Sequence, residues 1–370
     1  MNKCCLACLG VLTLAAGLSA PVAAYTRQDQ DAAIESYLSA FYTVTNEAPA
    51  PAGNFVKNDT TRDYPTSSSF WRNAEEMEMV EDAYDRTHND KYKTTIVSLY
   101  NGFVKVNGTN WLGNNYNDDL MWITMATLRA YQITGDKTYY TQAKWCFDNT
   151  WSRAYDPIGG GVWWSTDKSS KNACIAGPAA IAALLIYQCG GGSQYLDDAK
   201  AAFNWEVKTL YEPTGLVHDN ISAGVVSGGA TTYNQGTFIG AAYLLDAATG
   251  NHDNEPYALA AALFTRDHRS DPNQLLDDEY SMGDGDSDNA GFKGIFVRWC
   301  GLWARKTNNH EVLAWLRRNA QTVVDRRNKA GLTWGLWDQP TPDTSVTAWE
   351  CSDAVALLQD VPPIPPSSIH

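Results

Sequence analysis

The sequence is poor in basic residues: 28 Lys and Arg stand against 42 Asp and Glu, which gives a formal net charge of −14. A surface of this charge repels phosphate groups, so we expect no nucleic-acid partner and no binding to anionic membranes. An uncharged polymer is not repelled. The charge balance therefore leaves polysaccharides among the possible substrates.

Motifs for metals and cofactors are also missing. The chain contains no HExxH motif, no GxSxG elbow, no P-loop and no dinucleotide fingerprint. The acidic run 284–289 (DGDSDN) resembles the start of a calcium loop, but Ile295 stands where the twelfth-position acid belongs. We expect no metal and no cofactor, and we interpret this run as a solvated loop, one of whose acids could contact substrate.

Cysteines are few once residues 1–24 are set aside. Those residues have a basic start, an apolar stretch and a small-residue end, as in a secretory signal peptide. Five cysteines follow, an odd number without a CxxC pair, so both disulfides and a reduced, buried set remain open. We expect a secreted monomer without a membrane anchor, ending in a disordered Pro-rich tail at 361–370.

Aromatic residues, in contrast, are abundant. The chain has 14 Trp and 19 Tyr but only 10 Phe. Trp and Tyr combine an apolar face with a polar edge, which complements the apolar face and hydroxyl rim of a sugar ring. This composition favours a carbohydrate ligand, although most of these side chains can equally fill a large helical core.

A repeated helical hairpin predicts the fold. Apolar residues recur at helical spacing, and glycine-containing turns separate the segments. Helices are predicted at 28–42, 72–88, 118–133, 139–151, 172–187, 195–211, 235–248, 257–264, 292–306, 311–328 and 345–358. We pair the first two as one hairpin. Residues 25–360 then predict an all-α (α/α)6 barrel, a toroid of helical hairpins, with an open helical array as the alternative.

Two neighbouring acids carry the strongest chemical signal. Asn117 is a predicted N-cap, so Asp118 and Asp119 fall in the first turn of a helix and can project into a loop-lined cleft. Retaining glycosidases hold two carboxyl groups roughly 5–5.5 Å apart, one ionised and one protonated. The helix N-terminus favours one negative charge, which raises the pKa of the other acid. The alternative is that both acids simply cap the helix.

Five segments together resemble glycoside hydrolase family 76, the endo-α-1,6-mannanases. They are 116–122 (YNDDLMW), 159–164 (GGGVWW), 171–173 (KNA), 232–236 (TYNQG) and 292–298 (FKGIFVR). The resemblance implies an (α/α)6 barrel and a retaining double displacement. By position in the motif, Asp118 is the implied nucleophile and Asp119 the implied acid/base. The implied partner is α-1,6-linked mannan or a manno-oligosaccharide.

Further residues are candidates for substrate binding because they lie in predicted loops or at helix starts. Only one of the adjacent Trp163 and Trp164 is expected to face a cleft, and core packing or helix capping is the alternative for each candidate. The candidates are Asn117, Trp163, Trp164, Asn172, Tyr233, Asn234 and Gln235, with Trp71, Trp111 and Trp122 as weaker ones.

Three functions follow from these observations. The first is a retaining hydrolase that cuts within α-1,6-mannan. The second is a transglycosylase on a mannose-containing cell-wall or anchor glycan, which shares the first chemical step. The third is a non-catalytic glycan-binding protein that has kept the barrel, against which the intact pair Asp118 and Asp119 argues.

Overall fold

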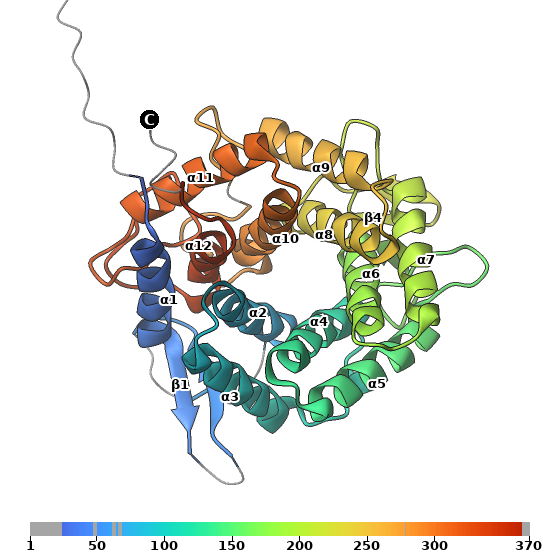
Figure 1. Ribbon diagram of the computed structural model, residues 1–370, viewed down its shortest axis with the longest axis horizontal. Coiled ribbons are helices and arrows are strands. Elements are labelled where there is room, and N and C mark those ends of the chain that lie inside the picture. The colour runs from blue at the N-terminus through green and yellow to red at the C-terminus, as the bar shows by residue number, and fades with distance from the viewer. Residues whose placement is uncertain (1–23, 47–49, 61–63, 66–68, 278, 365–370) are drawn as a thin grey trace, which may run out of the picture.

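The protein folds as two concentric rings of helices. The computed structural model describes residues 24–364 except 47–49, 61–63, 66–68 and 278. Six helices form the inner ring (Figure 1): α2 (Phe70–Thr87), α4 (Asn117–Thr134), α6 (Ala173–Gln188), α8 (Thr232–Thr249), α10 (Phe292–Lys306) and α12 (Ala348–Asp360). Six surround them: α1 (Arg27–Phe41), α3 (Asp90–Asn107), α5 (Lys137–Ala154), α7 (Ser193–Thr209), α9 (Glu255–His268) and α11 (His310–Asp325).

Burial explains which helices lie inside. Residues 173–186 of α6 are all buried, whereas α11 buries one apolar stripe and exposes the rest. A helix that is apolar all round must be covered on every side, and an amphipathic helix needs cover on one face only. Each inner helix packs on the next, and α12 packs on α2, so the ring is closed. The predicted (α/α)6 barrel is confirmed.

Charged side chains of three inner helices meet inside the ring. Arg298 of α10 contacts Glu75, Glu78 and Asp82 of α2, with its Nε 2.7 Å from Asp82 Oδ2. Arg129 of α4 contacts the same helix, 2.7 Å from Asp82 Oδ1. Buried charges are tolerated only when they are paired, so these contacts fix α2 against α4 and α10.

The predicted first hairpin is wrong. The outer partner of α2 is α3, which the sequence prediction missed, and α1 packs instead on α12. The turn between α2 and α3 is made by His88, whose φ is 52°. A non-glycine residue in this left-handed conformation gives no turn signal in the sequence. The sequence prediction therefore did not recognise α3 as a helix and left its residues in a loop.

The described strands are short. β1 (Tyr42–Thr45) pairs with β2 (Ala52–Phe55) beside α3. β3 (Ser170–Asn172), β4 (Asn220–Ser222) and β5 (Val225–Ser227) form an antiparallel sheet in that order. Because β3 leads directly into α6, this sheet stands at the end of the ring where the inner helices begin.

The two ends of the described chain meet. The Tyr25 hydroxyl donates to the Val361 carbonyl at 2.9 Å, and Gln30 Nε2 donates to the same oxygen at 3.0 Å. Val361 is fully buried, so the predicted disordered tail does not begin there. Residues 1–23 of the predicted leader and 365–370 lie outside the described residues. No helix of the described part has the length and apolarity to span a membrane.

Candidate active site

A cleft of about 770 Å³ opens where the inner helices begin. Five of the six inner helices or the turns leading into them line it, together with the three-stranded sheet. Its walls combine aromatic rings with carboxyl, amide and hydroxyl groups. The lining residues are Trp71, Tyr116, Asp118, Asp119, Trp122, Trp164, Ser169, Ser170, Asn172, Cys174, Asp219, Asn220, Ser222, Tyr233, Asp288 and Phe292.

The start of α4 places two acids in this cleft. Asp118 and Asp119 lie in its first turn, as predicted, but the N-cap is Tyr116 and not Asn117. The Asn117 side chain cannot cap because it is used elsewhere: Nδ2 donates to the Trp163 carbonyl at 2.8 Å, and Oδ1 accepts from Arg153 at 2.6 Å. Asn117 thereby ties the first turn of α4 to two other segments.

Asp118 is enclosed by groups from three elements. The Trp164 indole and the Cys174 thiol hydrogen bond to its carboxyl group. The Cys174 thiol is in turn hydrogen bonded to Tyr233. Oδ1 of Asp118 is buried without a hydrogen-bond partner among the described residues. The carboxyl group is therefore held in one orientation but poorly solvated.

Asp119 is held from the loop before the helix. Asn114 Nδ2 donates to Asp119 Oδ2 at 2.7 Å. Arg153 fixes that loop, because its guanidinium donates to the carbonyls of Leu112 and Asn114 at 2.9 and 2.8 Å. Asp119 can therefore contact a ligand while its orientation is maintained.

The environment raises the pKa of both acids. Burial raises the pKa of Asp118 to about 7, and the neighbouring charge of Asp119 adds to the shift. Burial also raises the pKa of Asp119 to about 6, against the hydrogen bond from Asn114, which lowers it. Two interacting acids lose their protons in two successive steps, whose pKa values belong to the pair and not to either residue. Near neutral pH the pair can hold one proton, which is the state that acid-assisted nucleophilic attack requires.

Aromatic rings of α2, α4, α8 and α10 line part of the cleft. Tyr233 stacks on Phe292 with ring centroids 3.9 Å apart, and Trp122 lies 6.4 Å from Tyr233. Trp71 lies 6.2 Å from Trp122. Near the acids, Trp164 packs against Tyr116 at 5.1 Å. These faces suit the apolar side of a sugar ring.

Polar groups also line the cleft. Asp219 accepts from Asn220 at 2.9 Å and from Asn234 at 3.0 Å, so both of its oxygens have partners within the protein. Asp288, in the acidic run 284–289, accepts two hydrogen bonds from Arg72 at 2.9 and 2.6 Å. The run is thus held by an arginine, and one of its acids reaches the cleft.

The other predicted binding residues divide into two groups. Trp164, Asn172 and Tyr233 line the cleft, as do the weaker candidates Trp71 and Trp122. The second group does not reach it. Asn117, Asn234, Gln235 and Trp111 are at most 1 % exposed and bond to neighbouring protein groups, and Trp163 faces a separate pocket.

Several groups of the site lacked a sequence signal. Cys174, Asp219 and Arg153 reach the acids or the cleft only because the ring brings distant segments together. Asn114 lies in the loop just before the acidic pair, and Asp288 lies in the acidic run, so for these two a signal existed.

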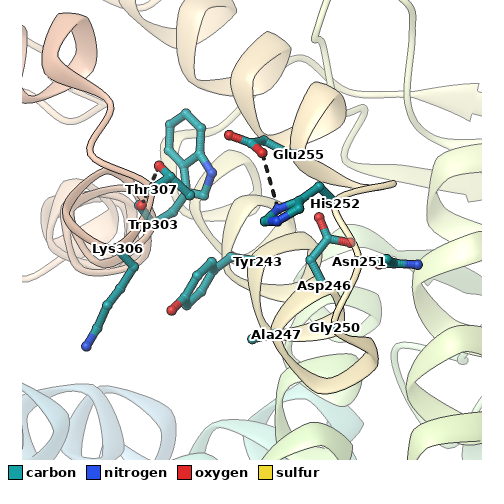
Figure 2. A pocket seen from close by; sticks show the side chains of 10 residues that line it. All are labelled: Tyr243, Asp246, Ala247, Gly250, Asn251, His252, Glu255, Trp303, Lys306 and Thr307. Carbon is teal, nitrogen blue, oxygen red and sulfur yellow. Dashed lines mark hydrogen bonds and ion pairs between the residues drawn. The ribbon is translucent and has the colours of Figure 1, made fainter.

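A cavity of about 400 Å³ occupies the opposite end of the ring, between the last turns of α8 and α10 (Figure 2). Its polar groups include His252, 3.5 Å from Glu255, and Lys306. It contains no adjacent carboxyl pair, so glycosidic cleavage has no support there. Within the described residues no cluster of three His, Cys, Asp or Glu side chains could hold a metal ion.

Comparison with known proteins identifies a family. Residues 26–360 match the family model described as Glycosyl hydrolase family 76. The α-1,6-mannanase GH76A from Salegentibacter sp. HEL1_6 is similar, with 29% identity, a TM-score of 0.79 and coverage of 90% of this chain and 98% of that one. An inactive variant of that enzyme is known in complex with α-1,6-mannotetraose, at 28% identity, TM-score 0.79, and coverage of 90% and 97%.

A more distant structure shares the fold. Dfg5 from Chaetomium thermophilum, in complex with glucosamine, is 14% identical, with a TM-score of 0.74 and coverage of 93% of this chain and 94% of that one. A comparison with curated proteins finds no significant match.

Proposed function

The chain belongs to glycosyl hydrolase family 76, and on this premise we propose that it hydrolyses α-1,6-mannosidic bonds within mannan chains, with retention of configuration. The observation that carries the proposal is the adjacent pair Asp118 and Asp119, placed in a sugar-sized cleft and titrating together near neutral pH. The similarity to an α-1,6-mannanase supports the choice of linkage.

We assign the two acids different tasks. Asp118 is fixed by Trp164 and Cys174, as a nucleophile aimed at one carbon must be. Asp119 is held by Asn114 and protonates the glycosidic oxygen as Asp118 attacks the anomeric carbon. In the second half, Asp119 takes a proton from water as the water oxygen bonds to the anomeric carbon; the ester bond to Asp118 breaks, which frees the mannan product and restores both acids.

The proton must be on Asp119 for the first step. Burial raises the pKa of both acids, so near neutral pH the free pair shares one proton. The proposed roles require this proton to reside on Asp119 when substrate binds. A glycosidic oxygen beside Asp119 accepts a hydrogen bond only from the protonated form, and this favours the proton on Asp119.

The remaining lining groups suit substrate binding. Trp71 and Tyr233 offer ring faces, while Asn172 and Asp219 offer acceptors for sugar hydroxyls. The barrel holds these groups on helix starts and on a sheet, so little ordering is needed when the sugar binds. Secretion through a cleaved leader stays part of the proposal, since an extended mannan is met outside the cell.

The test is a set of amide variants assayed on unbranched α-1,6-mannan. Asp118→Asn and Asp119→Asn should each lose at least about 100-fold in kcat, because neither an amide nucleophile nor an amide acid supports the step. Asp197→Asn is the matched control, since Asp197 belongs to an adjacent acid pair on the exposed side of α7. Thermal unfolding checks that all three variants remain folded.

Product analysis separates the proposed function from its alternatives. Internal cleavage shortens the average chain early, with few new reducing ends. Retention gives the α-anomer as the first product by NMR. Products longer than the substrate would indicate transfer to a sugar acceptor, and binding without new reducing ends would indicate a glycan-binding protein. Substantial turnover in either amide variant would contradict the assigned roles.

A further inference from the structure

A second pocket, of about 550 Å³, lies behind the wall of the catalytic cleft. The sheet formed by β3, β4 and β5 is that wall. Lys171 of β3 and Ile221 of β4 are paired across the sheet and line the second pocket, while their neighbours Ser170 and Asn220 line the cleft. Side chains alternate between the two faces of a strand, so one short sheet serves both spaces.

The two adjacent tryptophans follow the same alternation. Trp164 lines the cleft, and Trp163 lines the second pocket. A second indole, Trp205 of α7, lies on the other side of Lys171: the ammonium is 4.5 Å from the centroid of Trp163 and 5.9 Å from that of Trp205. Both rings are only partly buried. The pocket therefore presents two aromatic rings and a fixed cation.

The glycine run beside the pocket makes room for Trp205. A Cβ on Gly161 would lie 2.4 Å from the Trp205 ring, and one on Gly160 would lie 3.0 Å from it. Gly161 has a φ of 74°, which disfavours any side chain. The run thus supports the indole directly, and Trp205 keeps a defined position at the pocket.

Two lysines, Lys168 and Lys171, line the pocket, and the ammonium of Lys171 is paired with an acid. Asp156 accepts from the Lys171 ammonium at 2.6 Å, and the Gly160 carbonyl accepts a second N–H. An ammonium has three donors, so one remains for a ligand. The hydroxyls of Ser169, Ser222 and Thr209 also line the pocket. Ammonium donors, hydroxyls and aromatic faces together fit a hydroxyl-rich ligand such as a sugar.

Two residues join this pocket to the cleft. Ser169 and Ser222 line both spaces, and the Ser222 hydroxyl donates to the Ser169 carbonyl at 3.0 Å. They form a rim that a polymer leaving the cleft can cross. We propose that the pocket is a second carbohydrate-binding site, which holds a mannosyl residue of the same glycan beyond this rim.

This inference rests on the proposed function for the identity of the glycan. A second site adds contacts that only a long ligand can make, because both sites are engaged at once. A short oligosaccharide that fills the cleft gains nothing from it. The site should therefore lower KM for the polymer and leave cleavage of a tetrasaccharide unchanged.

The experiment compares full-length variants on unbranched α-1,6-mannan and on α-1,6-mannotetraose. Trp205→Ala removes one ring and Thr209→Trp fills the pocket, and each should raise KM for the polymer about tenfold, a loss of the size of one aromatic contact. With the tetrasaccharide, kcat/KM should stay within about twofold. Trp205→Tyr should restore most of the polymer affinity. Trp145→Ala, which removes a partly exposed indole of α5, is the matched control.

Equal losses on both substrates would overturn the proposal, because they would show a structural effect on the cleft. An unchanged KM for the polymer in both pocket variants would also overturn it. Binding without cleavage is measured as slower migration of the protein in mannan-containing gels, with each pocket substitution combined with Asp118→Asn. If the wild type cuts no mannan, the proposed function fails, whereas retardation that Trp205→Ala abolishes would still support the second site.

Discussion

Replacing Arg298 with methionine should strongly destabilise the barrel. Its guanidinium is 4% exposed and lies among Glu75, Glu78 and Asp82. Nε is 2.7 Å from Asp82 Oδ2, and a third nitrogen donates to the Glu75 carbonyl at 3.1 Å. Methionine fills similar space but leaves these acceptors without their shared cation.

The size of the destabilisation depends on which partners the three carboxyl groups keep in the variant. Removing one partner of a buried ion pair costs about 3–5 kcal/mol. The three carboxyl groups do not triple this value. Asp82 keeps Arg129 at 2.7 Å, and burial already raises the pKa of Glu75 to about 8, so Glu75 is largely protonated at neutral pH. We expect the free energy of unfolding to fall by about 3–5 kcal/mol at neutral pH.

The loss should grow with pH. The pKa of Glu75 is higher in the folded state than in the unfolded chain, so its contribution to stability is full at low pH and is lost as pH rises toward about 8. Without Arg298 this pKa rises further, and the loss becomes larger. Burial opposes ionisation of Asp82, but Arg298 and Arg129 hold its pKa below the usual value, which stabilises the fold above the unfolded pKa. Arg298→Met also loses part of the stabilisation that the ionised Asp82 provides.

The assay is denaturant unfolding of wild type and Arg298→Met at about pH 5 and about pH 8. The control is Lys329→Met, which removes a cation from an exposed pair with Asp343, with side-chain exposures of 88% and 49%, and should leave the free energy of unfolding nearly unchanged. The reasoning fails if Arg298→Met costs no more than Lys329→Met, or if its cost shrinks from the lower pH to the higher one.

Three further outcomes are expected. The kcat/KM on mannan should peak between about pH 6 and about pH 7, because Asp118 and Asp119 are both protonated below this range and both ionised above it; a pH–rate profile checks this. Asn114→Ala removes the hydrogen bond that lowers the pKa of Asp119, so the acid limb of that profile should move to higher pH by up to about one unit. Gly161→Ala should cost about 2–4 kcal/mol in unfolding experiments, since the new methyl group meets an indole, whereas Gly135→Ala, at φ 75° in open space, should cost only about 1 kcal/mol.

Strongly apolar helices were the most predictable part of the fold. The helix predicted at 292–306 has the observed bounds, and 118–133 differs from α4 by one residue at each end. Their patterns are long, and Gly135 marks the end of α4. The short turn between α2 and α3 lacks such a marker, because His88 stands where glycine usually ends a helix.

Within the site, the sequence predicted residues that are neighbours in the chain, but not residues that only the fold brings together. Asp118 and Asp119 are neighbours at a helix start, so their adjacency is visible in the sequence. That only one of Trp163 and Trp164 faces the cleft was predicted from their adjacency, but which one depends on the pairing of Trp163 with Lys171 of β3. Asp219 comes a hundred residues after the acids, and only closure of the ring brings it into the cleft.

Because the two chain ends pack on each other, the helical ring can close only after the last helix has been synthesised. Val361 receives its hydrogen bonds from Tyr25 and Gln30, and α12 closes the ring between α10 and α2. During synthesis, α2 and α4 leave the ribosome long before α12 exists to cover them. Their apolar and acidic inner faces stay uncovered until the last helix is made. A chain that stops before α12 therefore has an unclosed ring with exposed apolar surface, and it should aggregate.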